Sequence, residues 1–333
     1  MPAAQSARIR GAAGFSLVEL MVSIAVSLIV LSVVVTMFAG QSTARMNLDR
    51  AAGQIENGRY ALEMLTDELR LAGYYAELVH AVVGWSAPDP CRADAAGNGW
   101  ATAPLSTVPA PITGYDGTAV LACLPDRAPG TAAFAVRRLS VDTQASVSVA
   151  GGPDTYVQFS NCQDDPVGTR FVVGSDAASF QLRNGACSAP NVVRRYVSRI
   201  YFVARCDVCG VDRIPTLKVA EAVGGQLVVT PVAEGIEDLQ LDYGFDLDGD
   251  GTPDAWRLGL DGAAGSPGND WSNVMAVRVN ARSRGVTAVP GLVDARTYDM
   301  GLAGTSGPFG DGFVRRVYSV AVRLNNPAGR REL

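Results

Sequence analysis

The apolar and polar positions of this chain divide it into a membrane-like segment and a mixed segment. From Phe15 to Gly40 the only formally charged residue is Glu19, and a helix of that length is long enough to cross a hydrocarbon core of roughly 30 Å. We therefore predict a membrane-spanning helix over residues 15–40. Glu19 near its start is unusual, because an ionisable group within a membrane is costly and marks function or a partner.

After Gly40 the apolar positions recur in steps of four and three, which is typical of one face of a helix. The members of this stripe are Ala44, Leu48, Ala51, Ile55, Gly58, Leu62, Leu65, Leu69 and Ala72. The charged residues between them, including Glu63 and Glu68, are expected on a solvated or partner-facing side. We predict a single helix of roughly 90 Å from Phe15 to Tyr75, whose amphipathic part covers residues 41–75.

The rest of the chain predicts strands, because segments rich in β-branched and aromatic residues alternate with turn residues. The expected strands are 134–141, 156–159, 171–173, 192–203, 217–219, 227–232, 236–245, 274–281 and 314–324. Residues 86–118 are expected to form long irregular loops. The predicted fold class is α+β, with a long N-terminal helix packed on a mostly antiparallel sheet and a β-rich globular domain over residues 76–333.

Residues 1–14 form a short polar leader that carries Arg8 and Arg10. An ordinary secretory signal is cut after its apolar stretch, whereas the expected cut here lies before that stretch, between Gly14 and Phe15. Basic residues on the short side of a span place that side in the cytoplasm. We therefore expect an inner-membrane protein with a single span and a periplasmic C-terminal domain.

The stretch Gly14-Phe15-Ser16-Leu17-Val18-Glu19-Leu20 closely resembles the class III signal of type IV prepilins and pseudopilins. The resemblance implies that a prepilin peptidase cuts after Gly14 and methylates the new amino terminus at Phe15. It also implies that Glu19 pairs with the terminal amine of a neighbouring subunit, and a carboxylate in low dielectric does need a counter-charge. A plain membrane anchor with an incidental glutamate is the alternative.

Five further blocks are similar to PilW-type minor pilins. They are residues 54–63 with E-N-G-R-Y-A, 68–74, 232–239 with 242–244, 271–274 with 277–279, and 315–318. The resemblance implies a type IV pilin-like fold and a non-enzymatic subunit in the initiating or tip complex of a type IV pilus. Its partners would be other minor pilins, the major pilin and the inner-membrane assembly platform.

Through pilus assembly such a subunit would support adhesion, twitching motility or DNA uptake, and after assembly it would lie at the pilus tip or cell surface. Two alternatives stay open. One is a minor pseudopilin of type II secretion, which shares the leader and the helix. The other is a membrane-anchored calcium-binding adhesin that joins no filament.

Six cysteines lie beyond the long helix: Cys91, Cys123, Cys162, Cys187, Cys206 and Cys209. An even number in an exported domain indicates disulfides, and six cysteines allow 15 connectivities. We favour pairing in sequence order. The motif Cys206-Asp207-Val208-Cys209 has two other interpretations: a thiol-exchange motif, which expects a helix start, and half of a zinc site, which needs two more ligands although His80 is the only histidine.

One motif predicts a metal. Asp246, Asp248, Asp250 and Asp254 stand at positions 1, 3, 5 and 9 of a loop that has glycine at position 6, and hard oxygen ligands in this pattern wrap around calcium. The EF-hand match is partial, because Arg257 stands where a bidentate glutamate is expected. Asp261 could supply the missing oxygen. We expect calcium here, with a bare polar hairpin as the alternative.

The remaining composition gives no indication of catalysis or of nucleic-acid binding. Among 333 residues there are 28 basic and 33 acidic side chains, for a net charge of -5, which provides no attractive field for nucleic acid. The sequence holds no serine nucleophile motif, metal-histidine cluster or phosphate loop. Arginine pairs at 137–138, 194–195, 315–316 and 330–331 are expected to be solvated.

Overall fold

The computed structural model describes residues 14, 16–76, 78, 84–94, 97–101, 107–144, 154–165, 170–261 and 270–332. Phe15 and His80, both singled out in the sequence, lie outside the described residues. The chain divides into two compact units, Met1–Ala52 and Gly53–Leu333. The second unit therefore begins within the part of the helix that was predicted to be amphipathic.

Helix α1 (Leu17–Leu71) is continuous, close to the predicted limits of residues 15 and 75. Its first part, Leu17–Ser42, is long and apolar enough to cross a membrane. The helix ends where Gly73 adopts a positive φ of 70°, the left-handed conformation that glycine tolerates at a helix C-terminus. A second, short helix, α2 (Asn325–Arg331), lies near the end of the chain.

A seven-stranded antiparallel sheet forms the first half of the globular unit. Its strands are β3 (Ile112–Tyr115), β4 (Ala133–Leu139), β5 (Tyr156–Phe159), β6 (Phe171–Gly174), β7 (Val193–Ala204), β8 (Thr216–Val223) and β9 (Gln226–Glu234). The long strand β7 organises the sheet, because it pairs with β5 at its start, with β4 along its middle and with β8 at its end.

A four-stranded antiparallel sheet forms the second half, in the order β11-β10-β12-β15. Its strands are β10 (Ile236–Phe245), β11 (Ala255–Arg257), β12 (Val274–Arg284) and β15 (Arg315–Arg323). The chain passes from the first sheet to the second at Gly235, whose φ is 77° and whose Cβ, if present, would lie 2.8 Å from the carbonyl oxygen of Arg284. Only glycine fits this corner without strain.

Small elements complete the unit. Strands β1 (Gly84–Ser86) and β2 (Thr107–Pro109) pair in parallel, and β13 (Tyr298–Asp299) pairs with β14 (Thr305–Ser306) in antiparallel. Short 3-10 turns among the described residues include η2 (Ala177–Ser179), η3 (Trp271–Asn273) and η4 (Gly301–Ala303). The prediction that residues 86–118 are irregular throughout is wrong, because β2 and β3 lie within this range.

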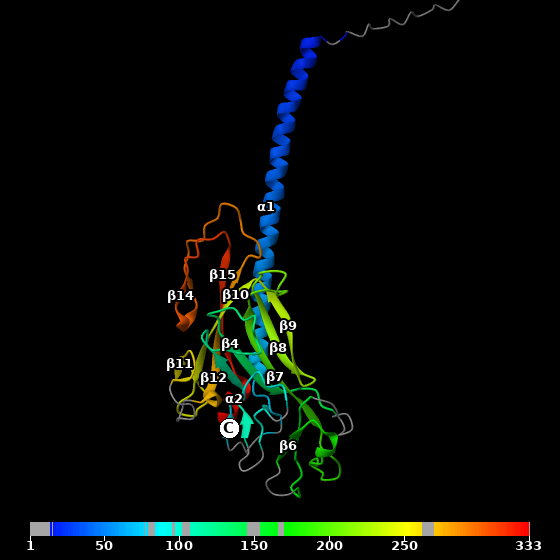
Figure 1. Cartoon of the computed structure of the whole chain (residues 1–333), viewed down its shortest axis with the longest axis vertical. Helices are drawn as coiled ribbons and strands as arrows, with labels where there is room; N and C mark the ends of the chain where they lie inside the picture. The colour runs from blue at the N-terminus through cyan, green and yellow to red at the C-terminus, as the bar shows by residue number, and fades with distance from the viewer. Residues whose placement is uncertain are drawn as a thin grey trace, which may run out of the picture. The chain divides into compact units, whose positions relative to one another are not determined.

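The last turns of α1 form the centre of the main core. Ala61, Leu65 and Leu69 are fully buried and pack in one cluster with side chains from both sheets. Figure 1 shows the strands of the globular unit grouped around this part of the helix. Burying apolar surface stabilises a fold by roughly 25 cal/mol per Å². This contact is therefore a major stabilising element of the unit.

Several charged side chains that the sequence placed in solvent are buried. Glu68 of α1 is 8% exposed, and its carboxylate accepts hydrogen bonds from Arg138 of β4 and Arg199 of β7. Arg137 and Arg315 are also buried. The expectation of solvated arginine pairs is therefore wrong for residues 137, 138 and 315, because these side chains have internal hydrogen-bond partners.

Candidate functional site

The start of α1 is built by Ser16 and Glu19. The backbone N–H of Ser16 donates a hydrogen bond to Oε2 of Glu19 at 3.0 Å. The S-x-x-E spacing is that of a capping box, in which a carboxylate in the first turn satisfies the backbone N–H of the cap residue. In a single chain Glu19 therefore has an internal partner, and Gly14 lies exposed just before the helix.

The helix beyond Glu19 offers an apolar surface with no internal partner. No residue of the membrane-like window within Leu17–Ser42 is buried. The hydroxyls of Ser23, Ser32 and Thr36 donate to backbone carbonyls of their own helix, which satisfies these polar groups without water, as lipid requires. This surface suits lipid or the apolar helices of other subunits.

The predicted calcium loop lies between β10 and β11. The structure brings carboxylate oxygens of Asp246, Asp248 and Asp254 within 4.8 Å of one another. Asp250 is not part of this group, and its carboxylate accepts hydrogen bonds from the backbone N–H and the hydroxyl of Thr252. Three of the four predicted ligands thus converge, which fits a hard cation in geometry.

Two arginines modify the electrostatics of this loop. Arg331 of α2 donates to Oδ2 of Asp246 at 2.7 Å, and the backbone N–H groups of Gly249 and Gly251 also donate to that carboxylate. Burial alone would raise the pKa of Asp246, but these hydrogen bonds outweigh it and lower the pKa. Asp261 forms an ion pair with Arg257 at 3.1 Å. Calcium binding stays a prediction.

Two family profiles match the chain. The profile described as Type IV Pilus-assembly protein W covers residues 200–326, from the end of β7 into α2. The profile described as Prokaryotic N-terminal methylation motif covers residues 9–35, which include Gly14 and Glu19. Together they make the chain similar to PilW-type prepilins. No curated protein and no solved structure matches the chain significantly.

These matches support four of the expectations from the sequence: processing, assembly with other pilins, a structural role and membrane anchoring. The methylation motif implies processing by prepilin peptidase and assembly with other pilins, and the pilin family is structural rather than enzymatic. The motif and the apolar helix indicate membrane anchoring. The sequence blocks at 232–244, 271–279 and 315–318 lie within the matched range, whereas those at 54–63 and 68–74 lie outside it.

Three disulfides close loops of the globular unit in sequence order: Cys91–Cys123, Cys162–Cys187 and Cys206–Cys209. In the chain-entropy description, the first two bridges stabilise by about 3.5 kcal/mol each and the third, with its very short loop, by about 2 kcal/mol. The third bridge follows strand β7 and lies in a turn, so a helix start is absent there. Its two sulfurs are bonded to each other and do not form half of a zinc site.

A buried ionic cluster was missed by the sequence analysis. Arg315, 2% exposed in its side chain, contacts carboxylates of Glu237, Asp294 and Asp311 at distances of 2.6, 3.0 and 2.6 Å. The cluster joins β10, β15 and the long connection between β12 and β15. Asp311 lies four residues before Arg315, whereas Asp294 and Glu237 are 21 and 78 residues away, so local periodicity could not show the whole cluster.

Proposed function

We propose that this PilW-like prepilin is a minor pilin in the initiating or tip complex of a type IV pilus. The supporting observation is the combination, in one chain, of a prepilin-type apolar helix capped by Glu19 and a sheet domain that matches the PilW family. The domain of residues 53–333 is large for a pilus shaft, which supports a place at the tip. Its role is recognition and templating of assembly.

Processing would produce the assembly-competent form. Prepilin peptidase would cut after Gly14 and methylate the amino terminus at Phe15, leaving the domain in the periplasm. Within the inner membrane, the helix would join those of other minor pilins and the major pilin on the assembly platform. By supporting assembly, the protein would support adhesion, twitching motility or DNA uptake.

Glu19 would set the axial register between subunits. In the single chain its carboxylate holds the N–H of Ser16, which is a neutral donor. The charged amine of a neighbouring subunit is a stronger partner in low dielectric, because both charges lose their water and each compensates the other. Only a subunit at the correct height along the helix would bring its amine to Glu19.

The test replaces Glu19→Ala in the host cell. We expect the variant to stay in the membrane while the number of pili per cell falls at least several-fold, because an unpaired amine would be left in the membrane. Glu63→Ala, an exposed site on the same helix, is the matched control and should leave piliation unchanged. Intact-mass analysis should give a mature chain that starts at methylated Phe15.

Other results would reject the proposal. Normal piliation with Glu19→Ala would indicate a plain anchor or a calcium-binding adhesin outside any filament. Loss of protein secretion with normal piliation would indicate a type II secretion pseudopilin. A chain that retains residues 1–14 in a host with active peptidase would contradict the processing step.

A further inference from the structure

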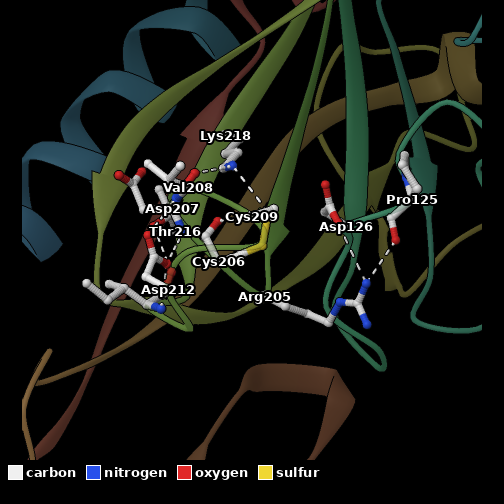
Figure 2. Close-up of a disulfide and its surroundings, with 11 residues drawn as sticks. Pro125, Asp126, Arg205, Cys206, Asp207, Val208, Cys209, Asp212, Thr216 and Lys218 are labelled. Atoms are coloured by element: carbon white, nitrogen blue, oxygen red, sulfur yellow. Dashed lines mark hydrogen bonds and ion pairs between the residues drawn. A yellow bond between two sulfur atoms is a disulfide. The ribbon is translucent and has the colours of Figure 1, made fainter.

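The Cys206–Cys209 disulfide lies beside the only lysine of the chain. Lys218 of β8 is 8% exposed, and its ammonium nitrogen lies 3.9 Å from Sγ of Cys209 and 2.7 Å from the carbonyl oxygen of Asp207. Figure 2 shows the ammonium directed at both atoms. Among the described residues, neither of the other two disulfides has a lysine or arginine nitrogen within hydrogen-bond distance of its sulfurs.

The loop around this disulfide is held without help from the sulfurs. The carboxylate of Asp212 accepts hydrogen bonds from the backbone N–H groups of Asp207, Val208 and Ile214 at 2.7 to 3.0 Å. The N–H of Asp212 in turn donates to the carbonyl of Val208. Because these hydrogen bonds fix the turn, opening the disulfide would leave the loop in place and keep Cys209 beside Lys218.

The two cysteine residues differ in exposure. Cys206 is 7% exposed, whereas Cys209 is partly exposed. Val208 and Val211 flank Cys209 and are 55% and 83% exposed, which gives a partner an apolar contact next to the more exposed cysteine. An incoming thiolate would therefore reach Cys209 rather than Cys206.

The charged groups around the sulfurs favour a thiolate on Cys209. Asp126 lies within 4.8 Å of both sulfurs, and its negative charge opposes that of Lys218. However, Asp126 is 45% exposed in its side chain and pairs with Arg205 at 3.7 Å, so water and Arg205 weaken its field. Asp207 and Asp212 also face the loop, and Asp212 is occupied by three backbone N–H groups. Lys218 is the buried charge nearest to Cys209, and burial strengthens its effect.

We propose that Cys206–Cys209 is a thiol–disulfide exchange site, with Cys209 as the exchanging sulfur and Lys218 as the residue that stabilises its thiolate. The reaction partner is a dithiol, carried by a protein or a small molecule. This inference does not depend on the proposed place in a pilus.

The exchange balances in two steps. A thiolate of the dithiol attacks Sγ of Cys209, the Cys206–Cys209 bond breaks, and Cys206 leaves with the electron pair and takes up a proton. The second thiol of the partner, as a thiolate, then attacks the partner's first sulfur, which is bonded to Cys209 in the mixed disulfide. A disulfide forms within the partner, and Cys209 is released as a thiolate beside Lys218. The prepilin disulfide is reduced to two thiols, and the partner dithiol is oxidised to a disulfide.

The experiment uses the full chain in detergent, equilibrated with mixtures of reduced and oxidised dithiothreitol, and then alkylated and analysed by mass spectrometry. We expect Cys206 and Cys209 to be reduced at mixtures in which the other two disulfides remain intact. In the reduced protein, alkylation of Cys209 should reach half its maximal rate at least one pH unit below the ordinary thiol value of about 8.5.

Three variants isolate the charges. Lys218→Met should move the alkylation midpoint up by about one pH unit and make reduction about tenfold less favourable, since one pH unit corresponds to a factor of ten. Lys218→Arg, which keeps the charge, should resemble the parent, and Asp126→Asn should shift the midpoint down or leave it unchanged. The two remaining disulfides report whether each variant is folded.

Two outcomes would overturn the proposal. The first is reduction of all three disulfides of the parent protein together, or of Cys206–Cys209 last, a result that needs no variant. The second is an alkylation midpoint of Cys209 that is ordinary in the parent or identical in Lys218→Met. Either would make the bridge a structural staple of the β7–β8 turn.

Discussion

Glu68 connects α1 to the seven-stranded sheet by charge. Its carboxylate contacts Arg138 at 3.2 Å, and it also binds Arg199. Both arginines are on central strands, and Arg199 also pairs with Glu221 of β8. A buried carboxylate between two guanidinium groups is strongly bound only while all three charged groups are present. Each group has lost much of its water, so removing one leaves another buried without a counter-charge.

Replacing Glu68→Ala should therefore destabilise the protein by about 3–5 kcal/mol, because it leaves Arg138 buried without a counter-charge. Urea unfolding followed by circular dichroism measures this effect. Glu63→Ala, five residues earlier and exposed, is the control and should change the free energy of unfolding by less than about 0.5 kcal/mol. Equal effects of the two substitutions would show that the Glu68 contacts contribute nothing to stability.

The Arg315 cluster predicts acid sensitivity. Hydrogen bonds from Arg315 lower the pKa of Asp311 to about 2. Burial alone would raise the pKa of Asp294, but hydrogen bonds from Tyr298 and Arg315 outweigh it and lower the pKa. A depressed carboxyl pKa contributes stability that is complete above the unfolded value of about 3.9 and is lost as the pH falls through the folded value.

We expect the urea concentration at the unfolding midpoint of the parent protein to decrease as the pH is lowered from about 4 to about 2. Asp311→Asn should lower stability at neutral pH and give a flatter dependence in the acid range, because the carboxyl group that takes up the proton is gone. Measuring the urea midpoint at several pH values across this range tests both parts. If the two proteins lose stability in parallel as the pH falls, the Asp311–Arg315 pair is not a source of the acid sensitivity.

At the scale of elements, the sequence predicted the parts of the fold that depend on local pattern. Strand β10 places every second residue from Leu239 to Phe245 in the core, and both of its limits match the prediction. Strands β2 and β3 were missed because they are short and lie among turn residues. The stripe on α1 identified Leu65 and Leu69 as core, but no helical pattern can show that Glu68 is buried, since its partners follow 70 and 131 residues later.

The candidate sites also divide into those that a local sequence pattern shows and those that only the fold brings together. Gly14, Phe15 and Glu19 form a contiguous motif, and the aspartates of the β10–β11 loop have regular spacing, so both were visible in the sequence. Lys218 and Arg315 act through partners brought together by strand pairing. Asp250 fits the calcium spacing, but its carboxylate is not among those that converge in the folded loop, a difference that spacing alone does not reveal.

The β10–β11 loop gives a prediction for one element. If the three converging carboxylates bind calcium with a dissociation constant of about 10⁻⁴–10⁻³ M, as extracellular modules do, calcium at ten times that constant should stabilise the protein by about 1.4 kcal/mol. Thermal unfolding with and without calcium measures this gain. Asp248→Asn should abolish it, whereas Asp250→Asn should preserve most of it.

An equal loss with both substitutions would favour the four-carboxylate arrangement predicted from spacing over the three that converge in the structure. No response of the parent protein to calcium would leave the loop as a polar hairpin. In that case, its charges would be balanced by Arg331 and the backbone N–H groups that already contact Asp246.

At the scale of the whole molecule, one continuous helix belongs to two units with different surroundings. Residues of α1 before Gly53 expose their apolar side chains, and those after it supply part of the core of the globular unit. The first part needs lipid or other subunits, and the second needs the two sheets. A protein built in this way can leave the membrane half available for assembly while its domain remains folded.

This division predicts where the chain can be cut. A fragment of residues 53–333 should be soluble and unfold cooperatively, because it retains all of the fully buried helix residues, including Ala61, Leu65 and Leu69. A fragment that starts at residue 73 should not, since the apolar faces of both sheets would meet water and Arg138 would lose Glu68. Calorimetry of the two fragments, produced under oxidising conditions, gives the comparison. Leu65→Ala in the longer fragment should lower stability by about 2–5 kcal/mol. Identical unfolding of the two fragments would mean that the sheets form a stable core without α1.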